Sequence, residues 1–281
     1  MRTEAKERKG IMTKVFWQEY TWKELESIIH SLEAVLIPVG STEQHGPHLP
    51  LGNDTFTVML VCEGVAKRLY PRILVAPSIS LGYSALHFSD GFPGTLSLRP
   101  ETLTQILCDL GHSFRIYGIR QIVIVNGHGG NSPAIAIAAS KMRVEMDLRV
   151  GYVNYWELIP PRVYRESLEK AYPSARHAGE FETSIALAYY PHLVRKDYLS
   201  AIGEADLGEV RSSDKTDDWK PRMSQTLFTD EYRPSGFSDD PRMAGEEKGK
   251  RFLDAAIEGL TTALEEFLKF EPRFCHRKPR G

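Results

Sequence analysis

The sequence predicts an α/β fold, a three-layer sandwich in which a mostly parallel sheet carries helices on both faces. Two patterns support this. Short β-branched runs alternate with longer segments of helical period, which is typical of βα units. The run at residues 121–125 is apolar almost throughout, as expected for a strand covered on both faces. The 281 residues are 42% hydrophobic and 26% charged, a balance compatible with one globular α/β unit.

The predicted elements follow one another with clear boundary signals. Pro100 and Glu101 open a helix, because proline suits the first turn and an acidic side chain suits the helix dipole there. In chain order we expect strand 35–39, helix 54–69, strand 73–77, helix 100–116, strand 121–125, helix 131–146, strand 150–155, helix 182–190 and helix 246–270.

Residues 200–245 are rich in Gly, Ser, Asp and Pro and show no clear period. We expect a long surface excursion that forms a lid or a subunit contact. The predicted domain covers residues 12–270, with residues 1–11 and 271–281 as flexible ends.

The charge balance argues against nucleic acid or a membrane as a partner. Lys and Arg total 35 against 37 Asp and Glu, which gives a formal net charge of -2. The three cysteines, Cys62, Cys108 and Cys275, lie far apart and form no CxxC pair. Residues 1–11 lack the apolar segment of a secretion signal. We therefore expect a cytoplasmic protein with reduced thiols.

The most informative segment is the loop after the first predicted strand. It carries Glu43 and His45, and Asp54 follows at the start of the predicted helix. Carboxylate oxygen and imidazole nitrogen are donors that zinc, manganese and iron accept. Open α/β sheets place ligands beyond the carboxyl ends of their strands. The pattern predicts a metal site here.

Further loops add chemistry-bearing residues. The first, after the third predicted strand, places His128 among Gly127, Gly129 and Gly130, where the backbone can turn sharply and approach a ligand. The second begins at His177 and leads into a predicted helix; a third is the Phe-Pro-Gly-Thr segment at residues 92–95.

In these motifs the sequence resembles the creatininase family of metal-dependent amidohydrolases. The resemblance covers about the first two-thirds of the chain, and more weakly residues 246–249. Four separated motifs in the right order make it specific. The matching residues are Glu43-Gln44-His45-Gly46, Asp54, Phe92-Pro93-Gly94-Thr95, Asn126-Gly127-His128 and His177-x-Gly-x-Phe-Glu-Thr-Ser.

The resemblance implies a site for two divalent ions of zinc, manganese or iron. Asp54 would bridge the ions, Glu43 and His128 would hold one, and His45 would hold the other with a further carboxylate. In creatininases proper that carboxylate lies two residues after the histidine of the third-strand loop, where this chain has a glycine. We infer that Glu180 takes this place, with Glu182 as the alternative ligand or a supporting residue.

The chemistry that follows is hydrolysis of an amide. Two cations bridged by a carboxylate lower the pKa of a shared water, which then attacks the carbonyl carbon. The tetrahedral intermediate is stabilised by nearby positive charge. The leaving nitrogen needs a proton, and His177 is the natural donor because an imidazole titrates near neutral pH.

Other residues are candidates for substrate contact. Their signals are weaker than those of the metal-site residues. His48 fits a hydrogen-bonded loop equally well, and His87 lies in a Gly- and Ser-rich loop. Trp156 matches a pocket tryptophan of the family but also suits a buried aromatic position. The candidates are Gln44, His48, His87, Gly129 and Trp156.

The expected substrate class is a small amide, cyclic amide or formamide. Creatininases proper have a second tryptophan four residues before the catalytic histidine, where this chain has Pro173, and this argues against creatinine itself. Deformylases of ribosylaminopyrimidine phosphates belong to the wider family, and Arg162, Arg165 and Arg176 would suit a phosphate rim or be solvated charges. A metal-binding protein without turnover is the alternative from another class. The resemblance also implies a homo-oligomer, such as a hexamer.

Overall fold

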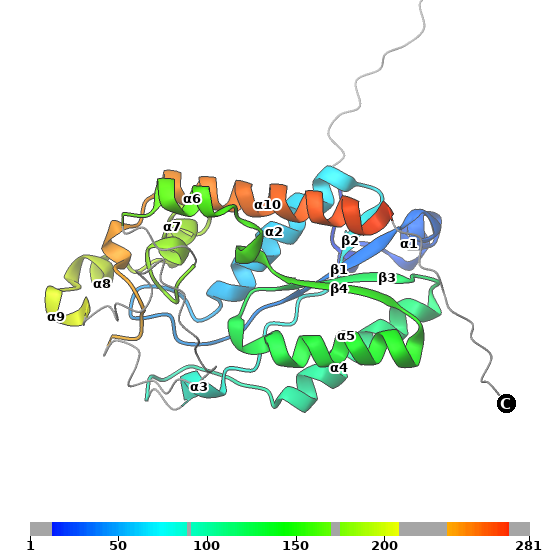
Figure 1. Ribbon diagram of the computed structural model, residues 1–281, viewed down its shortest axis with the longest axis horizontal. Helices are drawn as coiled ribbons and strands as arrows, with labels where there is room; N and C mark the ends of the chain where they lie inside the picture. Colours follow the sequence, from blue (N-terminus) through cyan, green and yellow to red (C-terminus); the bar gives the residue numbers. More distant parts are fainter. Residues whose placement is uncertain (1–12, 89–90, 170–174, 208–234, 270–281) are drawn as a thin grey trace, which may run out of the picture.

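Four parallel strands form the sheet, in the spatial order β2-β1-β3-β4. The computed structural model describes residues 13–88, 91–169, 175–207 and 235–269 (Figure 1). The predicted strands are confirmed, although each differs from its predicted bounds by one or two residues. The strands are β1 (Ala34–Val39), β2 (Ile73–Val75), β3 (Gln121–Asn126) and β4 (Arg149–Asn154).

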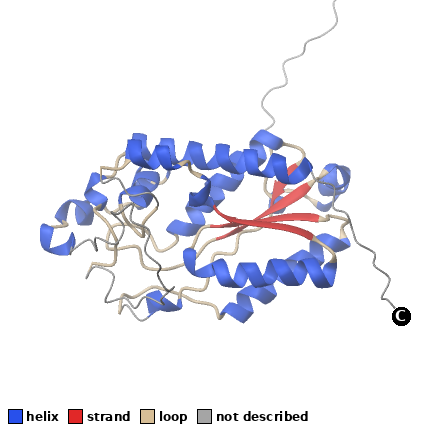
Figure 2. Ribbon diagram, viewed as in Figure 1, coloured by secondary structure: helices blue, strands red, loops and turns tan. Residues whose placement is uncertain are grey.

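Helices surround the sheet, as Figure 2 shows in blue around red. The α-helices are α1 (Trp22–Ile28), α2 (Asn53–Leu69), α3 (Ala85–Phe88), α4 (Pro100–Ile116), α5 (Ser132–Met146), α6 (Pro161–Ser167), α7 (Glu180–Tyr189), α8 (Lys196–Ala201), α9 (Glu204–Leu207) and α10 (Glu246–Lys269). The 3-10 helices are η1 (Trp17–Glu19), η2 (Ile29–Ser31), η3 (Gly129–Asn131), η4 (Tyr155–Leu158), η5 (Pro191–Leu193) and η8 (Pro241–Met243).

The two faces of the sheet belong to two cores, because successive side chains of a strand point to opposite faces. From β1, Val35 and Ile37 pack in the core shared with α4 and α5. Leu36 packs in the core shared with α2 and α10, which lie across the sheet from α4 and α5 in Figure 1. The predicted three-layer arrangement is therefore confirmed. Truncating a fully buried leucine of this kind costs about 2–5 kcal/mol of folding stability.

The topology brings two loops together at one edge of the sheet. Val39 and Asn126 are register partners at the carboxyl ends of the neighbouring strands β1 and β3. The loop at 40–52 and the loop at 127–131 therefore leave the sheet side by side. The first runs into α2, whose second residue is Asp54.

Helix α7 begins two residues earlier than the sequence predicts, at Glu180 instead of residue 182. Of the predicted excursion, residues 200–207 contain the end of α8 and α9, and residues 235–245 turn back toward the sheet edge; residues 208–234 lie outside the described part. Phe237 of this turn is fully buried. The predicted flexible ends also lie outside the described residues, and the domain limits stay a prediction.

Across the described segments of the chain, we find no helix with the length and apolar character needed to cross a membrane.

Candidate metal centre

The candidate ligands gather at the edge where β1 and β3 end. Glu43 and His45 come from the loop after β1, Asp54 from the first turn of α2, and His128 from the loop after β3. All four residues are buried. Gly127 permits the loop after β3 to pack closely against the first turn of α2, because a Cβ atom there would lie 2.7 Å from the backbone oxygen of Asp54.

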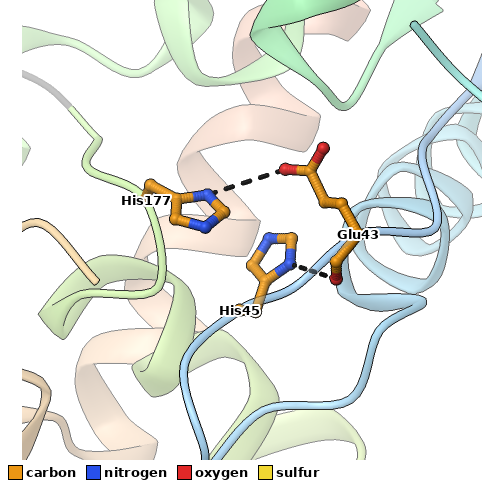
Figure 3. Close-up of side chains that lie close together, drawn as sticks. All are labelled: Glu43, His45 and His177. Atoms are coloured by element: carbon orange, nitrogen blue, oxygen red, sulfur yellow. Dashed lines mark hydrogen bonds and ion pairs between the residues drawn. The ribbon is translucent and has the colours of Figure 1, made fainter. Parts of the chain in front are cut away.

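A backbone carbonyl fixes the tautomer of His45. Its Nδ1 lies 3.2 Å from the backbone oxygen of Glu43, and a carbonyl oxygen only accepts hydrogen bonds (Figure 3). The Nδ1 atom therefore carries the proton in the neutral ring. The Nε2 atom is directed at two carboxylates instead, 3.0 Å from Asp54 Oδ1 and 3.6 Å from Glu182 Oε2.

His128 is held in the opposite tautomer by the same kind of contact. Its Nε2 lies 3.1 Å from the backbone oxygen of Tyr83, so this nitrogen donates. Its Nδ1 lies 3.1 Å from Glu43 Oε2 and 3.4 Å from Asp54 Oδ2. Each imidazole thus presents one nitrogen to the carboxylates, as metal-binding histidines do when a carbonyl orients them.

The two carboxylate oxygens of Asp54 face two different groups of potential metal ligands. Its Oδ1 faces His45 and its Oδ2 faces His128. Within the described residues, one group of potential ligands is Glu43, Asp54 and His128, and another is His45, Asp54 and Glu182; the ligand atoms of each group lie within 4.8 Å of one another. The aspartate belongs to both groups, the arrangement that a bridging carboxylate needs.

The expectation that Glu180 is a ligand does not agree with this geometry, and Glu182 occupies the expected place. Glu180 points away from the cluster: its Oε1 accepts a hydrogen bond from Lys248 Nζ at 2.6 Å, and its carboxylate accepts another from the backbone N–H of Glu169. The physical reason is helical, since residues two apart on a helix face different directions.

Three buried ligand atoms have no hydrogen-bond partner among the described residues: Glu43 Oε1, His45 Nε2 and Asp54 Oδ2. A buried polar atom without a partner costs free energy. The three residues belong to the two groups of potential ligands that share Asp54, so bound cations would satisfy these atoms. The donor set, carboxylate and imidazole, also fits zinc, manganese or iron.

The cluster attracts positive charge. Burial by itself lowers the pKa of His45, but the carboxylates of Asp54 and Glu182 outweigh it and raise this pKa to about 10. Burial likewise opposes protonation of His128, yet Glu43 and Asp54 hold its pKa well above the usual range. Burial raises the pKa of Glu182 to about 7, and the nearby Asp54 adds to this. Without a metal, protons therefore supply the positive charge that these carboxylates favour.

His177, the predicted proton donor, lies at the same site. Its Nδ1 is 3.6 Å from Glu43 Oε1, and its ring centroid is 4.4 Å from that of His45 (Figure 3). Burial, with the neighbouring His45 and His87, lowers the pKa of His177 well below its usual range. The ring is therefore neutral in the metal-free protein.

A cavity of about 400 Å³ opens onto the cluster. It is lined by the carboxylates of Glu43, Asp54 and Glu182 and by His128 and His177. Of the predicted substrate contacts, His87, Gly129 and Trp156 line it, and Arg176 of the three candidate arginines does too.

Two predicted substrate contacts lie outside the cavity wall. His48 is buried, and its Nε2 lies 2.8 Å from Thr183 Oγ1, a contact of the kind expected for the hydrogen-bonded loop alternative. Gln44 is buried behind the wall, where its amide nitrogen contacts His87 and His177. Pro173 lies outside the described residues.

Several supporting residues carry no signal in the sequence. Ser84 donates a hydrogen bond to Glu43 Oε2 at 2.7 Å. Asp239 accepts one from the backbone N–H of Glu180 at the start of α7, and the backbone N–H of Ser238 donates to the backbone oxygen of His177 at 2.8 Å. Serine and aspartate are common in loops, so only the fold reveals these roles.

Comparison with known proteins gives consistent matches. A family model described as creatininase, creatinine amidohydrolase, matches residues 18–264. Creatinine amidohydrolase of Pseudomonas putida is 32% identical over 270 residues, covering 90% of this chain and 96% of that protein. The mycofactocin precursor peptide peptidase of Mycolicibacterium smegmatis is 34% identical over 245 residues, covering 85% and 87%.

A more distant match is the 2-amino-5-formylamino-6-ribosylaminopyrimidin-4(3H)-one 5'-monophosphate deformylase of Methanothermobacter thermautotrophicus, 26% identical over 247 residues, covering 85% of this chain and 91% of that protein. Among solved structures, a creatininase superposes with a TM-score of 0.78 at 28% identity, covering 92% of this chain and all of that chain. Creatininase structures described as a manganese form and as a zinc–zinc form of a mutant, both 29% identical, match with a TM-score of 0.75.

Proposed function

This chain belongs to the creatininase family and is a metal-dependent hydrolase of carbon–nitrogen bonds, and from this premise we propose that it cleaves a small amide, cyclic amide or formamide with the help of two divalent ions. The observation that carries the proposal is that three buried atoms, Glu43 Oε1, His45 Nε2 and Asp54 Oδ2, have no hydrogen-bond partner in the described structure and belong to two ligand groups that share Asp54.

We assign the two groups of donors to two ions. Glu43, Asp54 and His128 would hold one, and His45, Asp54 and Glu182 would hold the other, with Asp54 as the bridge. Bound there, zinc, manganese or iron ions would supply Lewis-acid activation of a carbonyl and lower the pKa of a water molecule.

The side chains around these ligands would position the substrate. Trp156 and Leu86 line the cavity with apolar surface that favours a flat or apolar substrate group and displaces water. His177 would donate a hydrogen bond from Nδ1 to the leaving nitrogen, since this atom lies 3.6 Å from Glu43 Oε1 and the residue lines the cavity.

A second candidate activity is deformylation of a ribosylaminopyrimidine phosphate. The supporting observation is Arg176, which lines the cavity next to His177 and offers a planar, permanently charged group for an anionic substituent. Arg162 and Arg165 are exposed on α6 and do not line the cavity. Of the three arginines, Arg176 is therefore the candidate for phosphate binding.

The test is an assay of the metal-loaded protein against neutral amides, cyclic amides, N-formyl amines and their phosphorylated analogues, with products identified by mass spectrometry in ¹⁸O-labelled water. One labelled oxygen in the acid product supports hydrolysis. Turnover confined to phosphorylated formamides would select the second activity. Two bound metals with no turnover on any member would instead favour a metal-binding protein without catalysis.

We also propose a cytoplasmic homo-oligomer, such as a hexamer. Cys62 and Cys108 are free and buried, as suits a reducing compartment. Light scattering coupled to size-exclusion chromatography measures the number of subunits, and a monomer at micromolar concentration would contradict the proposal.

A further inference from the structure

The side-chain amide of Gln44 has one determined orientation. Its Oε1 accepts a hydrogen bond from the backbone N–H of Gly46 at 2.9 Å, and a backbone N–H only donates. The other end of the amide, Nε2, therefore points toward the imidazoles. The turn at residues 235–240 packs against it, because a Cβ atom on Gly236 would lie 2.4 Å from Oε1.

The amide nitrogen lies between two histidines. Gln44 Nε2 is 3.3 Å from His87 Nδ1 and 3.1 Å from His177 Nε2. An amide nitrogen carries two protons and accepts no hydrogen bond, so the ring nitrogens that face it must accept. In the neutral rings, His87 Nδ1 and His177 Nε2 therefore carry no proton.

The opposite edges of the two rings agree with this assignment. His87 Nε2 lies 3.5 Å from Glu43 Oε1, and His177 Nδ1 lies 3.6 Å from the same oxygen. A carboxylate only accepts, so a nitrogen carrying a proton suits that edge. The two rings stack with centroids 4.5 Å apart and planes inclined by 28°. One amide nitrogen can therefore donate a hydrogen bond to each ring.

We propose that Gln44 is a positioning residue that holds His87 and His177 in the tautomers whose N–H groups face Glu43 and the cavity. His177 thereby offers a hydrogen-bond donor at Nδ1, while its lone pair at Nε2 is engaged by the amide. The inference rests on the proposed place of His177 in the reaction, but the tautomer itself can be measured without turnover.

The backbone around His177 is held from a second direction. The N–H and the hydroxyl of Ser238 both donate to the backbone oxygen of His177, at 2.8 and 3.1 Å. Ser238 holds the backbone of His177 in position, whereas Gln44 determines which ring nitrogen of His177 is protonated. The two residues therefore form a matched pair for mutagenesis.

The test uses the zinc-loaded protein with ¹⁵N-labelled histidine and long-range ¹H–¹⁵N correlation spectra, which distinguish protonated from unprotonated ring nitrogens. His177→Asn and His87→Asn assign the signals. We expect protonation at Nδ1 of His177 and at Nε2 of His87 in the unaltered protein. In Gln44→Glu the carboxylate accepts where the amide donated, and protonation is expected at His177 Nε2.

Kinetics on a substrate found in the amide panel give a second readout. Gln44→Glu and the uncharged Gln44→Met should lower kcat by about tenfold or more with little change in KM, because a donor that acts in the transition state is lost. Ser238→Ala should leave the tautomer of His177 unchanged. Protonation of His177 at Nε2 in the unaltered protein, or an unchanged pattern in both Gln44 variants, would overturn the inference. If the panel reveals no turnover, the spectra still decide it.

Discussion

Glu180 and Glu182 lie two residues apart in the first turn of α7, yet their carboxylates face different parts of the protein. Glu182 Oε2 lies 3.6 Å from His45 Nε2 in the candidate metal centre. Glu180 Oε1 lies 2.6 Å from Lys248 Nζ and ties α7 to α10. The same chemical group thus lies in the candidate metal centre at one position and joins two helices at the other.

These two glutamates form a matched pair of substitutions. Glu182→Gln should lose the ion held with His45, so metal content measured by mass spectrometry should fall to about half. Glu180→Gln should keep both ions but lower the free energy of unfolding by about 1–3 kcal/mol, because the buried partner of Lys248 loses its charge. Equal metal loss in both variants would contradict the assignment of Glu182.

Asp54 is expected to be needed for both ions. Asp54→Asn keeps the shape of the side chain but removes the charge that its two oxygens present to His45 and His128. We expect loss of both ions and of all measurable turnover. The exposed Asp109→Asn serves as a control. Retention of one tightly bound ion in Asp54→Asn would show that the aspartate does not bridge.

His177→Ala should separate metal binding from catalysis. We expect an unchanged metal content and a fall in kcat of about 10²–10⁴-fold, the usual loss when a proton donor is removed. The histidine can also be grouped with Glu43 and His45 as a potential ligand, so metal analysis is essential. Release of metal by this variant would mean that His177 is a ligand.

Gly130 and Gly129 provide a steric test of the loop after β3. A Cβ atom at Gly130 would lie 2.3 Å from the backbone oxygen of Tyr83 and 2.4 Å from His128 Nε2. Gly130→Ala should therefore displace His128 and weaken metal binding at least tenfold, measured by chelator competition. At Gly129 no described atom lies within 4 Å of such a Cβ, so Gly129→Ala should bind metal normally. Similar affinities in the two variants would refute the steric explanation.

Metal affinity should rise with pH. A proton and a metal ion compete for His45 Nε2, and its raised pKa of about 10 means that metal must displace this proton throughout the neutral range. The proton on His128, whose pKa is held well above its usual range, is displaced in the same way. Below the Glu182 pKa of about 7 a further proton must leave, so the dependence should steepen there. Each displaced proton changes the apparent Kd by about tenfold per pH unit. Calorimetric or chelator titrations between pH 6 and 9 measure it, and a pH-independent Kd would contradict the protonation of His45.

The metal-free protein should show the matching trend in stability. His45 has a folded-state pKa above its unfolded value, so it stabilises the fold below the unfolded pKa, and this contribution is lost as pH rises through about 10. The raised pKa of Glu182 acts in the same direction, because the folded state disfavours its ionisation at neutral pH. Urea unfolding of the metal-free protein should thus give a lower midpoint at pH 9 than at pH 6.

The amino-acid pattern determined the architecture and most of the site. Alternating strands and helices specify parallel pairing, and parallel strands bring the loops at Glu43 and His128 to one edge whatever the details of packing. Local spacing also marked Asp54 at a helix start, where its carboxylate is favoured by the helix dipole. These features follow from short-range periodicity, which a sequence carries directly.

Tertiary structure decided the rest. The choice between Glu180 and Glu182 depends on where α7 begins and which way its first turn faces, and a shift of two residues in that start reverses the prediction. Gln44 contacts His177, which lies 133 positions away in the sequence. Ser238 donates a hydrogen bond to His177 from 61 positions away. Such contacts have no periodic signature in the sequence, because they arise only when the sheet brings distant loops together.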